Sequence, residues 1–227
     1  MPADHRPDGA RQPTAASVAS TARTVSDACP GAWRRHDAAD GALARFRPVG
    51  GAVDADELRA LSRAAITGGS PLELTSRGSL QVRGLTAEAA DALAGELRAL
   101  SSGPASLLDA QGRDLPCSVV ASPGAGRLDA AAATLAAALR GRTDVPGRLL
   151  VALDDGTRDV AGLGADVTVA NGTLTLAGSP ADVTADDPAA LALAAIEAFL
   201  AVRDGAWRVA EVGAERVASA VTGWYRS

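Results

Sequence analysis

Cysteine and histidine are scarce in this sequence of 227 residues, and lysine is absent. Cys29 and Cys117 lie far apart, and a four-iron four-sulfur cubane needs four thiolates, so this chain alone cannot ligate one. His5 and His36 are the only histidines, and no Ser/His/Asp arrangement can be assembled around them. These scarcities argue against a hydrolase and against a cluster held by this chain alone.

Long apolar runs are also missing, and aromatic residues make up only 3% of the chain. The alanine-rich run from Ala189 to Val202 is too short and too interrupted to span a bilayer. A net charge of -5 leaves no basic excess to displace counterions from nucleic acid. We therefore expect a protein that binds neither membrane nor nucleic acid. Two cysteines far apart fit a reducing compartment, so we also expect a cytoplasmic protein. All 22 basic residues are arginine, so only the position of an arginine carries information about function.

The pattern of turns and apolar residues predicts a disordered arm over residues 1–27 and two folded domains, over 28–103 and 115–227. In the first domain we expect a strand over 43–49, a helix over 54–67, a hairpin pairing 72–75 with 79–83, and a helix over 86–100. Asp54 with Glu57 forms a capping box, and Leu58, Leu61 and Ala65 form the apolar stripe of that helix.

The second domain is predicted to be a small α/β unit. We expect strands over 117–121 and 148–153, a helix over 129–140, and a hairpin pairing 167–170 with 173–177. Asn171-Gly172 is a strong type I′ turn signal for that hairpin. Asp187-Pro188 opens a helix to about Arg203, because proline is favoured at the first helical position. A short strand over 207–209 and a final helix from about Ala214 complete the prediction.

Arginines alternate along two segments of the first domain, Ala44-Arg45-Phe46-Arg47-Pro48-Val49-Gly50-Gly51 and Thr75-Ser76-Arg77-Gly78-Ser79-Leu80-Gln81-Val82-Arg83-Gly84. Alternate residues of a strand share a face, so several guanidinium groups can point into one cleft. Guanidinium binds carboxylate and phosphate bidentately. The pattern predicts a cleft for a ligand that carries many such groups, although a solvated strand face with ion pairs would look the same.

These two segments resemble the ferredoxin-like half-domain of the nitrite and sulfite reductases. Three further segments resemble the precorrin-3B synthase branch of that superfamily: Cys29-Pro30-Gly31, Ala121-Ser122-Pro123-Gly124-Ala125-Gly126 and Leu153-Asp154-Asp155-Gly156-Thr157-Arg158-Asp159-Val160. The resemblance implies an α+β fold, a ferredoxin-like half-domain followed by a small α/β domain with a mixed sheet. It also implies an oxidoreductase of cobalamin biosynthesis that binds siroheme and precorrin-3A.

By this resemblance, Arg45, Arg47, Arg77, Gln81 and Arg83 match positions that bind tetrapyrrole or anion. Full-length family members are two tandem copies with siroheme between them, and the cluster cysteines lie in the C-terminal copy. This chain resembles the N-terminal half only, so we expect a C-terminal half as partner chain, or self-association. Cys117 stands where the family pattern predicts a further cofactor-facing arginine. The resemblance also implies that Arg77→Ala lowers tetrapyrrole affinity with little change in folding.

Other interpretations stay open from the sequence. The chain is alternatively a non-catalytic tetrapyrrole- or partner-binding module, a nitrite or sulfite reductase half, or a degenerate fragment. Asp154, Asp155 and Asp159 lack the spacing of a calcium loop and are interpreted as a turn. Cys29 and Cys117 are interpreted as small core residues. Trp33, Trp207 and Trp224 are interpreted as packing anchors, with Trp224 also able to face a partner half.

Overall fold

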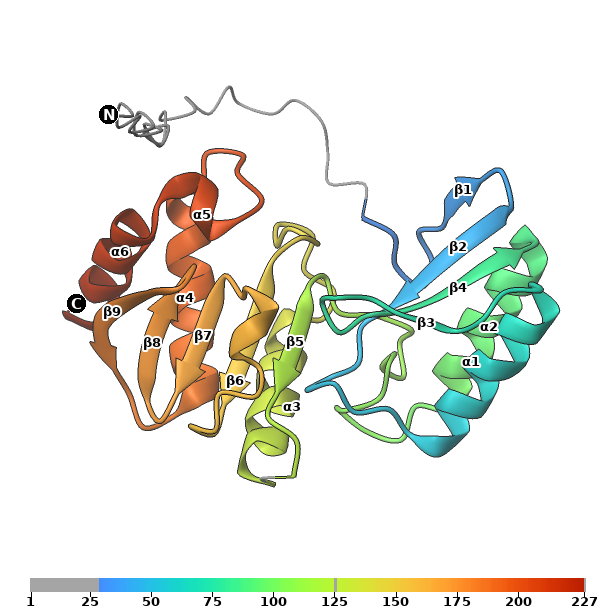
Figure 1. Cartoon of the computed structure of the whole chain (residues 1–227), viewed down its shortest axis with the longest axis horizontal. Helices are drawn as coiled ribbons and strands as arrows, with labels where there is room; N and C mark the ends of the chain where they lie inside the picture. Colours follow the sequence, from blue (N-terminus) through green and yellow to red (C-terminus); the bar gives the residue numbers. More distant parts are fainter. Residues whose placement is uncertain (1–28, 125, 227) are drawn as a thin grey trace, which may run out of the picture.

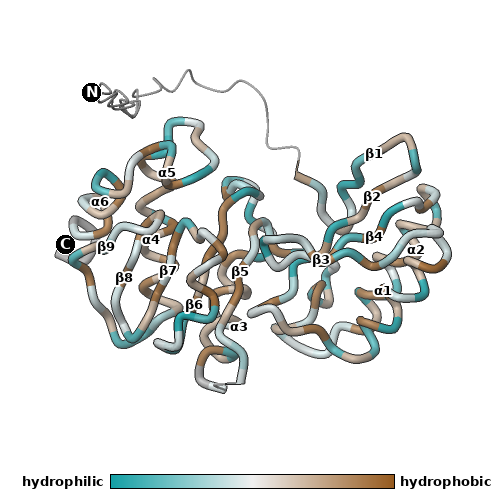
Figure 2. The backbone as a smooth tube through the Cα atoms, viewed as in Figure 1, coloured by the Kyte–Doolittle hydropathy of each residue, from teal (hydrophilic) through white to brown (hydrophobic). Residues whose placement is uncertain are grey.

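The computed structural model describes residues 29–124 and 126–226, so the arm predicted over 1–27 lies outside the described residues. The described part consists of two sheets lying side by side, each with its own helices (Figure 1). This arrangement confirms the predicted α+β class. Figure 2 shows apolar stretches along several of the strands and helices, including β5, β6 and α4. The domain boundaries at 28–103 and 115–227 stay predictions.

The first sheet is antiparallel with strand order β1-β2-β4-β3. Helices α1 and α2 pack on it and build a core that includes Phe46, Leu61, Val82 and Leu97. The elements are β1 (His36–Ala38), β2 (Gly41–Phe46), α1 (Ala55–Thr67), β3 (Glu73–Leu74), β4 (Leu80–Leu85) and α2 (Ala87–Ala99).

Helix α1 begins as the sequence predicts, but it buries a different stripe. The capping box is present, because the Asp54 side chain accepts from the first turn and Glu57 accepts from the Asp54 amide. Leu61 and Ala65 are buried, whereas Leu58 is 44% exposed, so the prediction for Leu58 is wrong. Glu57 takes the neighbouring buried position, because its other carboxylate oxygen accepts from the Leu107 amide at 2.8 Å.

The second sheet is mixed, with strand order β5-β6-β7-β8-β9. The first three strands are parallel, and the last three pair antiparallel. The hairpin over Asn171-Gly172 is confirmed, and both turn residues have the positive φ that a type I′ turn requires. The strands are β5 (Ser118–Ala121), β6 (Leu150–Asp154), β7 (Val167–Ala170), β8 (Thr173–Leu176) and β9 (Ser179–Thr184).

Helices cover one face of this second sheet, and a short 3-10 segment lies on the other (Figure 1). Asp187 caps α4 with proline at its start, as predicted. The strand predicted over 207–209 is wrong, since α5 begins at Val209 and the preceding residues form a bend. The elements are α3 (Arg127–Leu139), η1 (Ala161–Leu163), α4 (Pro188–Val202), α5 (Val209–Val212) and α6 (Ala214–Arg226). In the described part of the chain, no helix is long and apolar enough to cross a membrane.

The two sheets meet along a seam of backbone and side-chain hydrogen bonds. Gly50 forms a parallel bridge with Val120, donating to Val119 O at 3.0 Å and accepting from the Ala121 amide at 3.1 Å. The buried hydroxyls of Ser79 and Ser118 lie 3.0 Å apart across the same seam. The walls of any cleft between the sheets are therefore fixed relative to one another.

Candidate functional site

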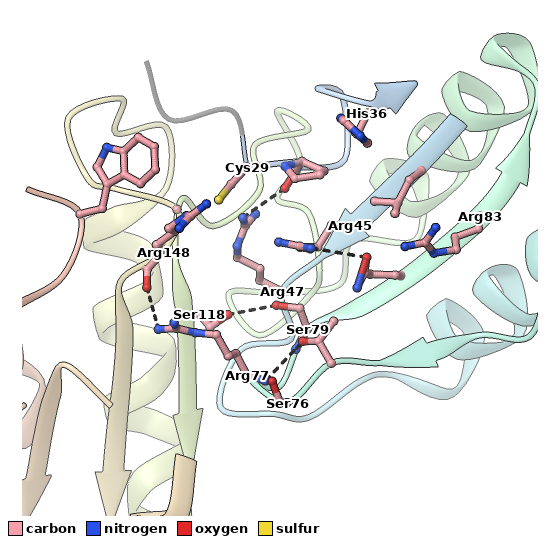
Figure 3. Close-up of a pocket in the computed structure, with 16 residues that line it drawn as sticks. Cys29, His36, Arg45, Arg47, Ser76, Arg77, Ser79, Arg83, Ser118 and Arg148 are labelled. Atoms are coloured by element: carbon pink, nitrogen blue, oxygen red, sulfur yellow. Dashed lines mark hydrogen bonds between the residues drawn. The ribbon is translucent and has the colours of Figure 1, made fainter. Parts of the chain in front are cut away.

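A cleft of about 660 Å³ opens where the first sheet meets the second (Figure 3). Strands β2 and β4 and the turn before β4 form one wall, and the Gly147-Arg148 segment with Trp207 forms the other. All five residues predicted from the sequence line this single cleft: Arg45, Arg47, Arg77, Gln81 and Arg83. We call it the arginine cleft.

The charge of the arginine cleft has one sign. Its lining contains five arginines, and none of the described residues that line it is Asp or Glu. The whole chain, by contrast, has a net charge of -5. A concave surface lined by one sign of charge raises the local concentration of ligands of the opposite sign.

Of the four predicted arginines, Arg45 has the weakest contacts with other residues of the described chain. It lies on β2 opposite Gln81 of β4, and its Nη2 donates to Gln81 Oε1 at a long 3.4 Å. Its Nε is buried, with no hydrogen-bond partner in the described structure. An unpaired buried donor costs roughly 1–3 kcal/mol, so the fold leaves the Arg45 guanidinium incompletely satisfied.

Arg47 lies just after β2, and backbone carbonyls hold its guanidinium. Nη1 donates to Leu115 O at 3.2 Å and Nη2 to Pro30 O at 3.1 Å. Burial lowers the pKa of Arg47, and the nearby Asp114 opposes that shift. Neutral carbonyls do not cancel its charge, so Arg47 both fastens the segment around Pro30 and contributes positive potential to the cleft.

Arg77 lies in the turn before β4 and reaches across to the second sheet. Its Nη2 donates to Arg148 O at 2.6 Å (Figure 3). The same Nη2 lies 3.4 Å from Asp166 Oδ2. Asp166 is fully buried and also pairs with Arg208 at 2.7 Å. Burial lowers the pKa of Arg77, with the charge of Arg208 acting in the same direction. Arg77 therefore has a joining role that its sequence position did not indicate.

Arg83 matches the interpretation as a solvated strand face. Its Nε donates to Glu73 Oε2 at 3.2 Å, and its Nη1 lies 3.7 Å from Asp40 Oδ2. Both pairs are partly exposed to solvent, where ion pairs contribute little stability. Arg83 therefore offers a ligand less free charge than Arg45 does.

Two lining residues from the second sheet's side were not predicted as site residues. The guanidinium of Arg148 lies 4.7 Å from the centre of the Trp207 ring, and no carboxylate among the described residues pairs with it. Stacking on an aromatic face orients a guanidinium while leaving its N–H edge open. The sequence placed Arg148 only at the start of a predicted strand, and no local signal links it to Trp207.

Cys117 is fully buried beside Arg47, at the position where the family pattern predicts an arginine. Burial raises the pKa of the Cys117 thiol to about 12. Its position in the core agrees with the packing interpretation. Cys29, in contrast, lines the arginine cleft (Figure 3).

We expect the Cys117 thiol to weaken the fold in alkaline solution. The unfolded thiol loses its proton near pH 8.5, whereas the folded thiol keeps it to about pH 12. Stability should fall above about pH 8.5, by at most about 1.4 kcal/mol per pH unit. Urea unfolding between about pH 7 and about pH 10 should show this slope in the native chain and a smaller slope in Cys117→Ala. If the free energy of unfolding falls equally with pH in the native chain and in Cys117→Ala, the prediction is wrong.

The acidic segment after β6 is a turn, as predicted. Asp154 Oδ1 accepts from the amides of Gly156 and Arg158, and Asp159 accepts from Ser122 Oγ at 2.5 Å. Across residues 29–124 and 126–226, no three His, Cys, Asp or Glu side chains are placed to share a metal ion. Trp224 belongs to the last turns of α6, where side chains lie outside the described part.

Comparison with known proteins identifies one region of the chain. Residues 36–100 match the family model described as the nitrite/sulfite reductase ferredoxin-like half domain. The chain therefore contains such a half domain, which belongs to a family of siroheme oxidoreductases. No curated protein matches the chain. The matched region covers β1 through α2 and supplies one wall of the arginine cleft.

The described residues fit one part of the family's cofactor set and not the other. Siroheme is a polycarboxylate, and the unpaired Nε of Arg45 together with the open guanidinium of Arg148 suits carboxylate groups. An iron–sulfur cubane needs four thiolates, whereas the whole sequence holds two cysteines, of which Cys117 is buried in the core. The arginine cleft is suited to the tetrapyrrole, and this chain alone is not suited to the cluster.

Proposed function

We propose that this chain is the tetrapyrrole-binding N-terminal half of a siroheme oxidoreductase of the precorrin-3B synthase type. The observation that carries the proposal is the arginine cleft, in which five arginines and no described Asp or Glu line one cavity beside the matched half domain. The ligands that the family resemblance implies are siroheme and precorrin-3A, and both carry many carboxylates.

Arg45 and Arg148 are the residues that would hold these carboxylates, one from each wall of the cleft. Arg47 would add positive potential, and Gln81 would orient Arg45 through its amide oxygen. Arg77 and Arg83 would contribute less, because carboxylates of this chain already engage them. Bound siroheme would supply the electron-transfer chemistry, and this chain's residues would bind and orient it.

The precorrin-3B synthase branch is proposed over a nitrite or sulfite reductase half because of the segment from Leu153 to Val160. That segment forms a tight turn pinned by Asp154 after β6. A second chain with the cluster cysteines, or a second copy of this chain, would complete the other side of the tetrapyrrole. A non-catalytic tetrapyrrole-binding module is the second candidate, favoured by the lack of four cysteines.

Siroheme titration of the full chain, followed at the Soret band, tests this proposal. We expect saturable binding that weakens at least about tenfold in Arg45→Ala and in Arg148→Ala, because a charge-assisted hydrogen bond contributes roughly 1.5–3 kcal/mol. Arg83→Ala should have a smaller effect, and Arg216→Ala on the exposed face of α6 serves as the matched control. If an Arg45→Ala/Arg148→Ala double variant remains folded and binds siroheme as tightly as the native chain does, the proposal is wrong.

Mixing the chain with a cysteine-bearing C-terminal half separates the two candidates. The enzyme half should form a stable complex with that partner, and the complex should carry the cluster. Saturable siroheme binding without any such complex would favour the non-catalytic module.

A further inference from the structure

The second sheet is covered on only part of the face that lies opposite its helices. There, η1 and its flanking residues pack over β5 and β6 in a small cluster with Leu150, Ala152 and Val160. Strands β7 and β8 turn Val167, Val169, Leu174 and Leu176 toward the helices, so Thr168, Ala170 and Thr175 lie on the opposite face. A hollow of about 610 Å³ occupies this uncovered part. We call it the sheet-face cavity.

Small residues and positively charged groups line the sheet-face cavity together. Its lining includes alanines such as Ala165, Ala170 and Ala177, and Arg158 and Arg208 add two guanidinium groups. Thr168 and Thr175 are paired across β7 and β8, so their hydroxyls lie side by side on this face. None of these residues lines the arginine cleft.

Arg158 has a strained backbone, and its guanidinium makes no hydrogen bond or ion pair with the described residues. Its φ is +66°, a left-handed value that is unfavourable for residues with a Cβ. Its amide donates to Asp154 Oδ1 at 3.1 Å, which holds the turn. Strained residues that persist in a fold are concentrated at binding sites.

Arg208 is positioned from the other side of the sheet-face cavity by two contacts. Its Nε donates to the buried Asp166 at 2.7 Å, and its Nη2 donates to Gly164 O at 2.9 Å. Its Nη1 has no partner in the described part of the chain. Because two contacts already fix the guanidinium, Nη1 could donate to a ligand without a change in the side-chain conformation.

Asp154 is the acidic residue that lines this cavity, and its carboxylate is directed into the turn. It is almost fully buried, and Oδ1 accepts from the amides of Gly156 and Arg158. Asn171 lies against the same turn, since a Cβ on Gly156 would approach Asn171 Nδ2 to 2.5 Å. The turn thus brings Arg158 and the Asn171 carboxamide to one edge of the hollow.

We propose that the sheet-face cavity binds a small ligand through a phosphate or carboxylate group. The forked donors of Arg158 match the geometry of either oxyanion, and Nη1 of Arg208 adds one further donor. The Asn171 carboxamide and the hydroxyls of Thr168 and Thr175 add neutral hydrogen-bonding groups beside the alanines that line the cavity. This site is separate from the arginine cleft and does not rest on the tetrapyrrole proposal.

Calorimetric titration of the full chain with pyrophosphate and, separately, with citrate tests this site and distinguishes the two oxyanions. We expect saturable binding of at least one probe, weakened about tenfold or more in Arg158→Gln because a charge-assisted hydrogen bond is lost. Arg216→Ala on the exposed face of α6, which lines neither cavity, is the control and should bind as the native chain does. Arg158→Gly should also abolish binding without lowering the melting temperature, because glycine adopts the left-handed conformation freely.

The controls separate this site from the arginine cleft. Siroheme titration should be the same in Arg158→Gln and in the native chain. Absence of binding by both probes, or binding that survives in Arg158→Gln and disappears in Arg45→Ala, would overturn the inference. A melting temperature that falls in Arg158→Gly would also count against it, because the arginine would then be structural.

Discussion

Replacement of Asp166 by alanine is expected to lower the free energy of unfolding by about 3–5 kcal/mol, the range for removing one partner of a buried ion pair. The Asp166 side chain is fully buried. It accepts from Arg208 Nε at 2.7 Å, the Leu150 amide at 2.9 Å, the Val209 amide at 3.0 Å and Arg77 Nη2 at 3.4 Å. Alanine would leave two guanidinium groups and two amides without their acceptor.

The consequences reach beyond local stability because the four donors come from different parts of the fold. Leu150 begins β6, Val209 begins α5, and Arg77 belongs to the first sheet's side of the seam. Without Asp166, the Arg77 side chain would lose one of its two anchors on the second sheet. We therefore expect siroheme binding to weaken in Asp166→Ala even at temperatures where the chain stays folded.

Urea unfolding followed by circular dichroism measures this prediction. Asp182→Ala is the matched control, because Asp182 is an exposed aspartate of β9 in the same sheet and its loss should change stability little. Asp166→Asn should give an intermediate loss, since the amide keeps one acceptor oxygen. Equal stabilities for Asp166→Ala and Asp182→Ala would show that the buried carboxylate does not hold the two sheets together.

Features that depend on a few neighbouring residues were predicted well from the sequence. The helix starts at Asp54 and Asp187 are confirmed, as is the turn at Asn171-Gly172. Each is a local hydrogen bond or a backbone preference, which the nearby residues decide by themselves.

Features that depend on distant contacts were not predicted. The segment from Trp207 to Val209 has the apolar pattern of a strand, but Asp166 binds Arg208 and the Val209 amide and draws this segment into the start of α5. Strand β9 was missed because Pro180 and Asp182 disfavour strands, although Ala181 and Val183 alternate inward as strand residues do.

The residues of the arginine cleft also fall into a part that the sequence predicts and a part that it does not. The cleft residues from β2 and β4 were predicted because they lie in motifs with regular spacing. Arg148 and Trp207 belong to segments whose meeting is set by the packing of the second sheet, and neither carries a local signal. The structure also distinguishes Arg45 from Arg77, which share one predicted role, because Asp166 engages Arg77 and not Arg45.

Replacement of Arg140 by methionine is the other substitution with a large expected effect, a loss of about 3 kcal/mol or more. Arg140 lies at the end of α3, is 7% exposed, and donates to four backbone carbonyls of the segment that connects the two sheets. The accepting residues are Arg113 at 2.6 Å, Leu107 and Pro104 at 3.3 Å, and Ser106. Each buried carbonyl left without a donor costs about 1–3 kcal/mol.

Methionine keeps much of the volume and apolar stem of Arg140, so the loss would report on the donors and not on a cavity. We expect a lower urea midpoint and faster proteolysis within residues 101–116, because the carbonyls there would turn to water and free the segment. Arg216→Met on exposed α6 is the control and should leave both unchanged. If Arg140→Met keeps the native midpoint and protease resistance, the connecting segment is held by Glu57 and the seam at Gly50 without Arg140.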